Sequence, residues 1–204
     1  MTGAAAALLG AGLAPWAAGM AGAQGLPVSG KAAKAMLFSP KHAEMRLIDH
    51  DFLAPADKQA LKLLPRIMKQ QQMPMKYYGA IAVAPSAGLL ARETTLFAMG
   101  HHSAEAARAA ALGGCEAARK GGRPCVIVAE VYPRGWKPRV LQLNQDATRG
   151  FRKYRRARGP KAFAASPSTG HWAFARGNGA AAEALARCNA EAGGAGDCRV
   201  VIRD

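Results

Sequence analysis

Residues 186–202 read ARCNAEAGGAGDCRVVI: nine residues separate two cysteines, and a run of β-branched side chains follows at once. Residues 112–128, LGGCEAARKGGRPCVIV, repeat this arrangement with the same spacing. In both stretches the segment between the cysteines is rich in glycine, which favours a turn, and the valines and isoleucines after it favour a strand. The chain therefore contains the same local arrangement twice.

The sequence upstream of each cysteine pair extends the similarity. Residues 78–88 (YGAIAVAPSAG) and 161–170 (KAFAASPSTG) each place a short β-prone run before a Pro-Ser-x-Gly turn, as in a hairpin. Residues 94–100 (TTLFAMG) and 171–177 (HWAFARG) supply the returning aromatic strands. Alanine-rich segments lead from these strands to the cysteines, and alanine has the highest helix propensity.

Each unit is therefore expected to run β-β-α-β, the first over residues 77–133 and the second over residues 161–204. At 204 residues the chain is long enough to bury a substantial core. We predict an α+β fold in which the two β-β-α-β repeats form a mostly antiparallel, disulfide-stapled sheet with the Ala-rich helices on one face.

The four cysteines are interpreted as two local disulfides. Bridging Cys115 to Cys125, and Cys188 to Cys198, would join the end of a helix to the start of the next strand. Closing a loop of about eleven residues removes roughly 2.8 kcal/mol of unfolded-state entropy in the chain-entropy model. A disulfide between the units stays possible, because four cysteines allow three pairings. A structural zinc site is disfavoured because its cysteines usually lie two to four residues apart.

The N-terminal residues indicate export. Residues 1–23 are uncharged and end in Ala-Gly-Ala, an A-x-A pattern, so we interpret them as a signal peptide cleaved before Gln24. The alternative is a cytosolic protein with an Ala/Gly-rich tail. No segment has eighteen consecutive apolar residues, so an integral membrane protein is not expected. The expected location is the periplasm or the medium, and disulfides suit both.

Residues 24–76 are expected to form a helical lead-in to the first unit. Apolar residues recur at helical spacing at Leu61, Leu64 and Met68, and Pro55 is a suitable first residue for the helix. Pro65 lies inside this run and is expected to kink or split the helix.

Residues 134–160 form a basic linker between the units and carry much of the formal net charge of +15. Phe151 and Tyr154 alternate there with cations, a mixture found on surfaces that bind phosphates. The alternative is a solvated helix with both rings in the core. The candidate anion-binding residues are Arg149, Arg152, Lys153, Arg155, Arg156 and Arg158.

One cluster of possible metal ligands differs between the units. His101 and Glu105 are four residues apart and would share a helix face beside His102, as in a site with two histidines and one carboxylate. The favoured interpretation is that Ser103 caps a helix and Glu105 lies at the favourable end of the helix dipole. Asp49, His50 and Asp51 are interpreted as loop polarity. No P-loop, dinucleotide fingerprint or serine-nucleophile motif is present, and no cofactor is expected.

These motifs resemble a widespread family of small exported bacterial proteins whose domain has no known function. The resemblance rests on Gly79 to Ala82, on the turn from Pro85 to Gly88, and on Cys115 and Cys125; the second unit lacks the opening glycine but keeps the turn and both cysteines. It implies an exported, disulfide-linked α+β module and brings no catalytic residues. Some similar sequences bear a 5-aminolevulinate synthase label, which the residues of this chain do not support.

The sequence thus favours an exported binding or structural module over an enzyme. The expected partner is an anionic polymer or lipid of the cell envelope, or another protein. Nucleic acid is a poor expectation for an exported chain. The alternative from another class is a small metal-assisted hydrolase that uses His101, His102 and Glu105.

Overall fold

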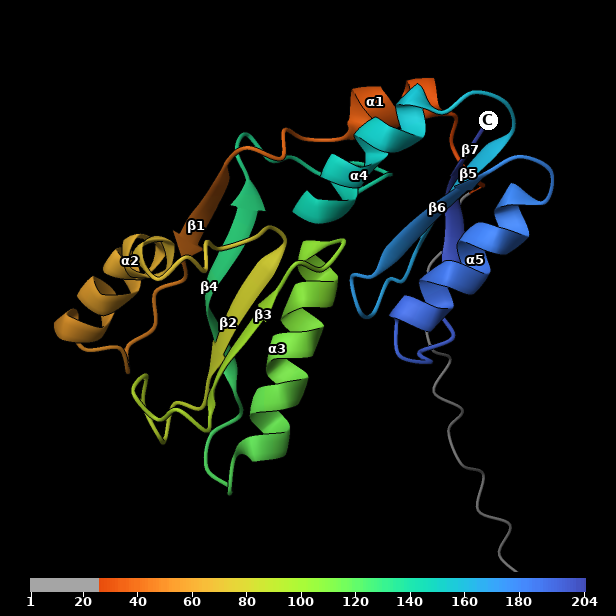
Figure 1. The fold of residues 1–204 in the computed structure, drawn as a ribbon. Helices are drawn as coiled ribbons and strands as arrows, with labels where there is room; N and C mark the ends of the chain where they lie inside the picture. The colour runs from red at the N-terminus through yellow and green to blue at the C-terminus, as the bar shows by residue number, and fades with distance from the viewer. Residues whose placement is uncertain (1–25) are drawn as a thin grey trace, which may run out of the picture.

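The computed structural model describes residues 26–204, so the expected signal peptide over residues 1–23 lies outside the described residues. That range contains five helices and seven strands. The strands form two separate antiparallel sheets, one in each unit (Figure 1). The α+β class is confirmed. The strands of the two units form separate sheets, of four and three strands.

The first unit contains the four-stranded sheet, with strand order β1-β4-β2-β3. One face is covered by the Ala-rich helix that ends near the cysteine pair, and the other face packs against a helix that precedes the first hairpin. The elements are β1 (Ala43–Leu47), α2 (Pro55–Gln70), β2 (Gly79–Val83), β3 (Thr95–Met99), α3 (Ala104–Ala118) and β4 (Val126–Pro133).

The second unit contains the three-stranded sheet, with strand order β6-β5-β7. It too has a helix layer on each face, because one Ala-rich helix packs on one side and the linker helix packs on the other. The elements are α4 (Gln145–Arg156), β5 (Lys161–Ala165), β6 (Trp172–Arg176), α5 (Ala180–Glu191) and β7 (Arg199–Arg203).

The strand pairing is the same in both units. The first strand of the hairpin lies in the middle, with the returning strand on one side and the last strand on the other. The pairing with the last strand shifts register between Ile81 and Ala82 in one unit and between Phe163 and Ala164 in the other. The structure thus has the expected β-β-α-β order in each unit, with matching irregularities.

Both local disulfides are confirmed. Cys115 bonds to Cys125 and Cys188 to Cys198, with Cα–Cα distances of 6.1 and 6.0 Å. The residue after the first cysteine accepts a hydrogen bond from the backbone N–H of the second: Glu116 does so at 2.7 Å and Asn189 at 3.3 Å. Each disulfide therefore ties the helix on one face of the sheet to the strand that follows it.

The segment before the first unit differs from a purely helical lead-in. Between its two helices it contributes β1, which pairs with β4 at the edge of the first sheet. Its longer helix, α2, begins at Pro55 as expected and runs through Pro65 without being split, because residues on both sides remain helical. Strand β1 was not predicted, although Glu44 and Arg46 alternate with less polar residues in the two-residue period of a strand.

The start of the described chain belongs to the second unit. Val28 forms a parallel bridge with Ile202 of β7, and helix α1 (Gly30–Met36) contributes Ala33 and Met36 to the core beneath α4. The chain then crosses to the first unit and enters β1 (Figure 1). The N-terminal segment therefore connects the two units in addition to the linker.

Candidate functional site

Asn144 lies at the interface between the two units, which we call the seam, and forms hydrogen bonds to both. Its side-chain amide donates hydrogen bonds to the carbonyl oxygen of Gly100 in the first unit and, at 2.7 Å, to that of Gly170 in the second. Its side-chain oxygen accepts from the N–H of Ala147 at 2.8 Å and so caps α4. One buried side chain thus fixes both units and the linker helix.

His102 lies at the same seam, with both ring nitrogens engaged. Its Nδ1 accepts from the backbone N–H of Asn144, so Nε2 carries the proton and donates to the carbonyl oxygen of His171, with both distances 3.1 Å. Burial lowers the pKa of His102 to about 4, although the bond to the His171 carbonyl opposes this shift. The ring is therefore a neutral structural contact that joins the units.

The possible metal site at His101, His102 and Glu105 is not formed. Within residues 26–204 no group of three or more His, Cys, Asp or Glu side chains is placed to hold a metal ion. Both nitrogens of His102 are already engaged, and Glu105 is exposed in the first turn of α3, where a carboxylate favours the helix dipole. Ser103 caps that helix as expected, accepting from Ala106 N–H at 3.1 Å.

The Asp49, His50 and Asp51 group also serves local structure. The His50 Nε2 lies 2.8 Å from the carbonyl oxygen of Ile127, and Asp49 pairs with Lys58 at 2.5 Å. The hydrogen bond from Lys58 lowers the pKa of Asp49, which is exposed. These contacts tie the loop to β4 and to α2.

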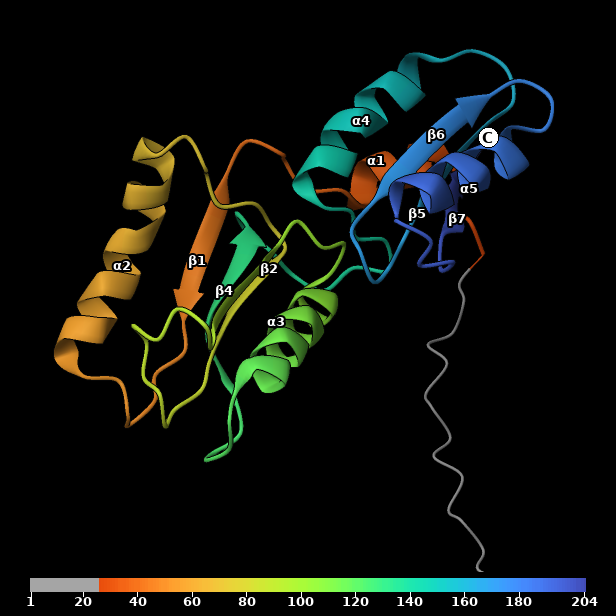
Figure 2. The same cartoon turned by 60° about the horizontal axis from the view of Figure 1, so that its bottom comes forward.

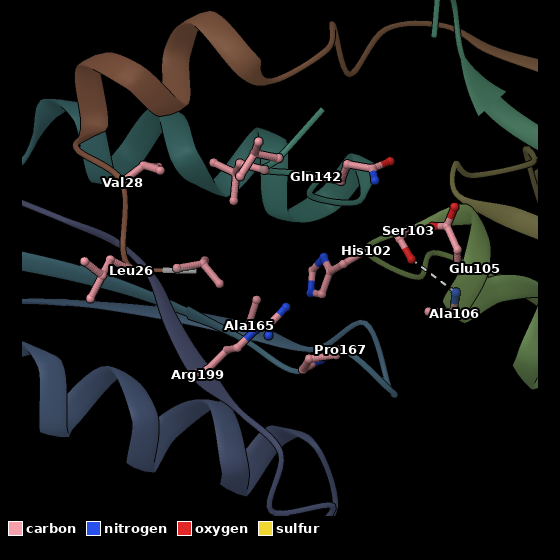
Figure 3. Close-up of a pocket in the computed structure, with 13 residues that line it drawn as sticks. Leu26, Val28, His102, Ser103, Glu105, Ala106, Gln142, Ala165, Pro167 and Arg199 are labelled. Carbon is pink, nitrogen blue, oxygen red and sulfur yellow. Dashed lines mark hydrogen bonds between the residues drawn. The ribbon is translucent and has the colours of Figure 1, made fainter. Parts of the chain in front are cut away.

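A pocket of about 340 Å³ opens at the seam (Figure 3). His102 lies at one side of it, and Arg199 of β7 lies across from the N-terminal end of α3. Because Ser103 caps the helix and His102 bonds to backbone groups, no pair of nucleophile and base is arranged here within the described residues. The lining residues are Leu26, Val28, His102, Ser103, Glu105, Ala106, Val140, Leu141, Gln142, Ala165, Pro167, Arg199 and Val201.

Helix α4, inside the basic linker, is anchored by its apolar side. Phe151 and Tyr154 are buried in the core of the second unit, as the solvated-helix alternative predicted. Gly150 leaves room for the indole of Trp172, since a Cβ at that position would overlap the ring. The Trp172 ring stacks on Phe163 with centroids 5.1 Å apart. The orientation of α4 is therefore fixed by ring packing.

The outer side of α4 carries the candidate anion-binding residues except Arg158, which follows the end of the helix. Arg149, Arg152, Lys153 and Arg156 follow the spacing i, i+3, i+4, i+7, so they share one face of the helix. Arg149 pairs with Asp146 at 3.0 Å. Within residues 26–204 the other candidates have no acidic partner and are exposed; these are Arg152, Lys153, Arg155, Arg156 and Arg158.

Two features of the seam were missed from the sequence. The N-cap at Asn144 was not predicted, although an asparagine directly before a run of helix-compatible residues is a common N-cap. Its bonds to Gly100 and Gly170 had no sequence signal, because they join groups 44 and 26 residues away.

No helix within residues 26–204 is long and apolar enough to cross a membrane. Comparisons of the chain with protein-family models, curated proteins and solved structures gave no match. The function is therefore argued from the geometry of this chain.

Proposed function

We propose that the protein is an exported, non-enzymatic module that binds an anionic polymer or lipid surface of the cell envelope through the outer face of α4. The observation that carries this proposal is the row of exposed cations on α4 that have no acidic partner within the described residues. Unpaired cations on a fixed helix retain their charge for a ligand, whereas paired ones are already partly neutralised.

The spacing of the cations supports an extended ligand. At 1.5 Å per residue, the unpaired Arg152 and Arg156 lie about 6 Å apart along the helix axis. Because the cations follow the surface of one helix and do not converge on a pocket, they suit repeated anionic groups better than one small anion. Helix α1 lies beside α4 in both views of the fold and adds Lys31 and Lys34, which are exposed (Figure 2).

The anchoring of α4 supports the same proposal. Tyr154 packs edge-to-face against Phe163 and Phe174, with centroids 6.1 and 6.3 Å away. A helix held by its rings presents its cations in one arrangement, so little order has to be gained on binding.

An oxidising compartment is the second part of the proposal. All four cysteines are paired, and disulfides persist mainly in exported proteins. Outside the cytoplasm the available polyanions are envelope polymers and lipid headgroups, which makes nucleic acid a poor partner. Intact mass of the protein isolated from the exported fraction tests this part: a chain that begins at Gln24 with no free thiol agrees with it, and an intracellular chain with four free thiols contradicts it.

The binding surface is tested by a charge-matched pair of variants. The first carries R152Q, K153Q, R155Q and R156Q, and the control carries R66Q, K69Q, K120Q and R123Q, which remove the same charge elsewhere. Each cation near an anionic surface contributes about 1 kcal/mol, so the α4 variant should bind vesicles containing phosphatidylglycerol at least about tenfold more weakly than the control. It should also elute from heparin at lower salt. Equal losses in the two variants would show that only net charge matters.

A further inference from the structure

A second surface, independent of α4, lies in the first unit. A groove of about 430 Å³ runs between α2 and β3, and we call it the α2–β3 groove. It exposes apolar side chains that a folded chain normally covers: Leu90 is 82% exposed and Phe97 is 46% exposed. The lining residues are Ala60, Leu61, Leu64, Leu89, Leu90, Arg92, Thr95 and Phe97.

In the second unit, the surface that corresponds to the α2–β3 groove is covered by other side chains. Phe97 lies opposite Ile81 in the first hairpin, and Phe174 lies opposite Phe163 in the second, so the two hairpins have the same register. In this register Thr95 takes the place of Trp172. The indole of Trp172 covers the second sheet, whereas a threonine leaves the corresponding position open.

The helices explain the rest of the difference. Helix α4 packs on β5 and β6, so it covers the hairpin and the aromatic side chains on it. Helix α2 packs on the face that carries Ile81 and Val83, but it lies toward β1 and away from β3 (Figure 2). The groove is therefore the uncovered counterpart of a surface that is covered in the second unit by Trp172 and α4.

The charge around the groove indicates the chemistry of its partner. Arg92 is exposed in the groove lining, next to Glu93 in the sequence. The four basic residues of α2 lie outside the groove lining, so Arg92 is the cation that the described residues place in it; those four are Lys58, Lys62, Arg66 and Lys69. A second copy of this chain would bring a net charge of +15 to the same surface, so an acidic partner is favoured over self-association.

We propose that the α2–β3 groove docks a segment of a partner protein that inserts an aromatic side chain between Leu64, Leu90 and Phe97. Aspartate or glutamate residues beside that aromatic residue face Arg92. The aromatic ring supplies most of the buried apolar area, as Trp172 does within the second unit, and the acidic residues accelerate association.

The test uses a fluorescein-labelled peptide of sequence Asp-Glu-Gly-Trp-Gly-Glu-Asp and measures its binding by fluorescence anisotropy. Two variants change the groove: Thr95→Trp fills it as the second unit does, and Leu90→Ser removes an exposed anchor with little effect on folding. Val140→Ser is the matched control, because Val140 is 90% exposed and lies outside the groove. Each groove variant should weaken binding by about tenfold or more, as for a central interface residue, and the control by less than about twofold.

Companion peptides test the two parts of the chemistry. Replacement of the peptide tryptophan by serine, or of its acids by lysines, should each abolish saturable binding. The proposal is overturned if the wild-type chain does not bind the acidic tryptophan peptide, if Thr95→Trp and Leu90→Ser bind it as well as the wild type does, or if the lysine peptide binds equally. It is also overturned if sedimentation gives a wild-type dimer that Leu90→Ser dissociates, because a second copy would then occupy the groove.

Discussion

The two units share one face of their sheets and differ on the other. On the shared face, an Ala-rich helix is tied to the last strand by a disulfide, and the residue after the first cysteine binds the N–H of the second cysteine. On the opposite face, α4 and Trp172 close the second unit, whereas α2 leaves the α2–β3 groove open. Both proposed binding surfaces lie on the side opposite the Ala-rich helices. The face with the Ala-rich helix is thus the same in both units, and the proposed binding surfaces lie where the units differ.

A second difference lies in the length of the Ala-rich helix. Fifteen residues lead from Gly100 to Cys115, but only eleven lead from Gly177 to Cys188. Three of the four additional residues lie in the helix, since α3 has 15 residues and α5 has 12. His102 lies in the loop just before α3, where it bonds Asn144 and His171. The first unit thus contacts the second through this loop.

The largest expected effect tests the shared face. Replacing Cys115 and Cys125 by serine, or Cys188 and Cys198, should lower the free energy of unfolding by about 3 kcal/mol, because both disulfides close loops of the same length. Denaturant unfolding of the two double variants measures this. Losses that differ by more than about 2 kcal/mol would mean that the two disulfides are not equivalent parts of one scaffold, since the entropic contribution is equal.

The next effect tests the seam. The pKa of His102 is lowered from its ordinary value of 6.5 to about 4, so the unfolded chain binds a proton more readily than the folded one. Stability should therefore be fully present above pH 6.5, fall by about 3 kcal/mol as the pH drops to 4, and level off below that value. His102→Gln keeps a donor and an acceptor but does not titrate. The difference between wild type and His102→Gln should follow this course, and a difference independent of pH would contradict it.

The smallest effect tests how closely Trp172 packs on α4 in the second unit. The test substitutes Gly150 in α4 and, as a control, Gly113 in α3 of the first unit. Gly150→Ala in α4 should lower stability by about 1–3 kcal/mol, because the new methyl group overlaps the ring of Trp172. Gly113→Ala in α3 meets nothing within 4 Å, so it should raise stability by about 1 kcal/mol through helix propensity alone. Thermal melting of the two variants gives the sign. An increase in both would mean that Trp172 does not pack closely against α4.

The scaffold could be predicted from the sequence because its signals are local. The cysteine spacing, the Gly-rich turns and the Ala-rich helices each lie within a short stretch, and they gave the disulfide pairs and the β-β-α-β order within each unit correctly. The strand β1 was missed because its partner β4 lies far along the chain, and a five-residue alternation is weak evidence by itself.

The seam and the binding surfaces depend on contacts that no local pattern specifies. Gly150 in the basic linker has a function only once Trp172 is placed against it, and Asn144 only once Gly100 and Gly170 converge. The cations of α4 were recognised from their number, but their shared outer face required the burial of Phe151 on the other side. The α2–β3 groove became visible only when the two folded units were compared.

A chemical-shift map of the ¹⁵N-labelled chain tests the division between the two binding surfaces most directly. Titration with a heparin oligosaccharide should shift the backbone amide signals of residues 149–158, and the acidic tryptophan peptide should shift those of residues 60–67 and 89–97. The two sets should not overlap, and the peptide should still bind when heparin is present. Shifts spread over both surfaces with either ligand would show that net positive charge alone governs binding, and would contradict the proposal that the two units have specialised differently.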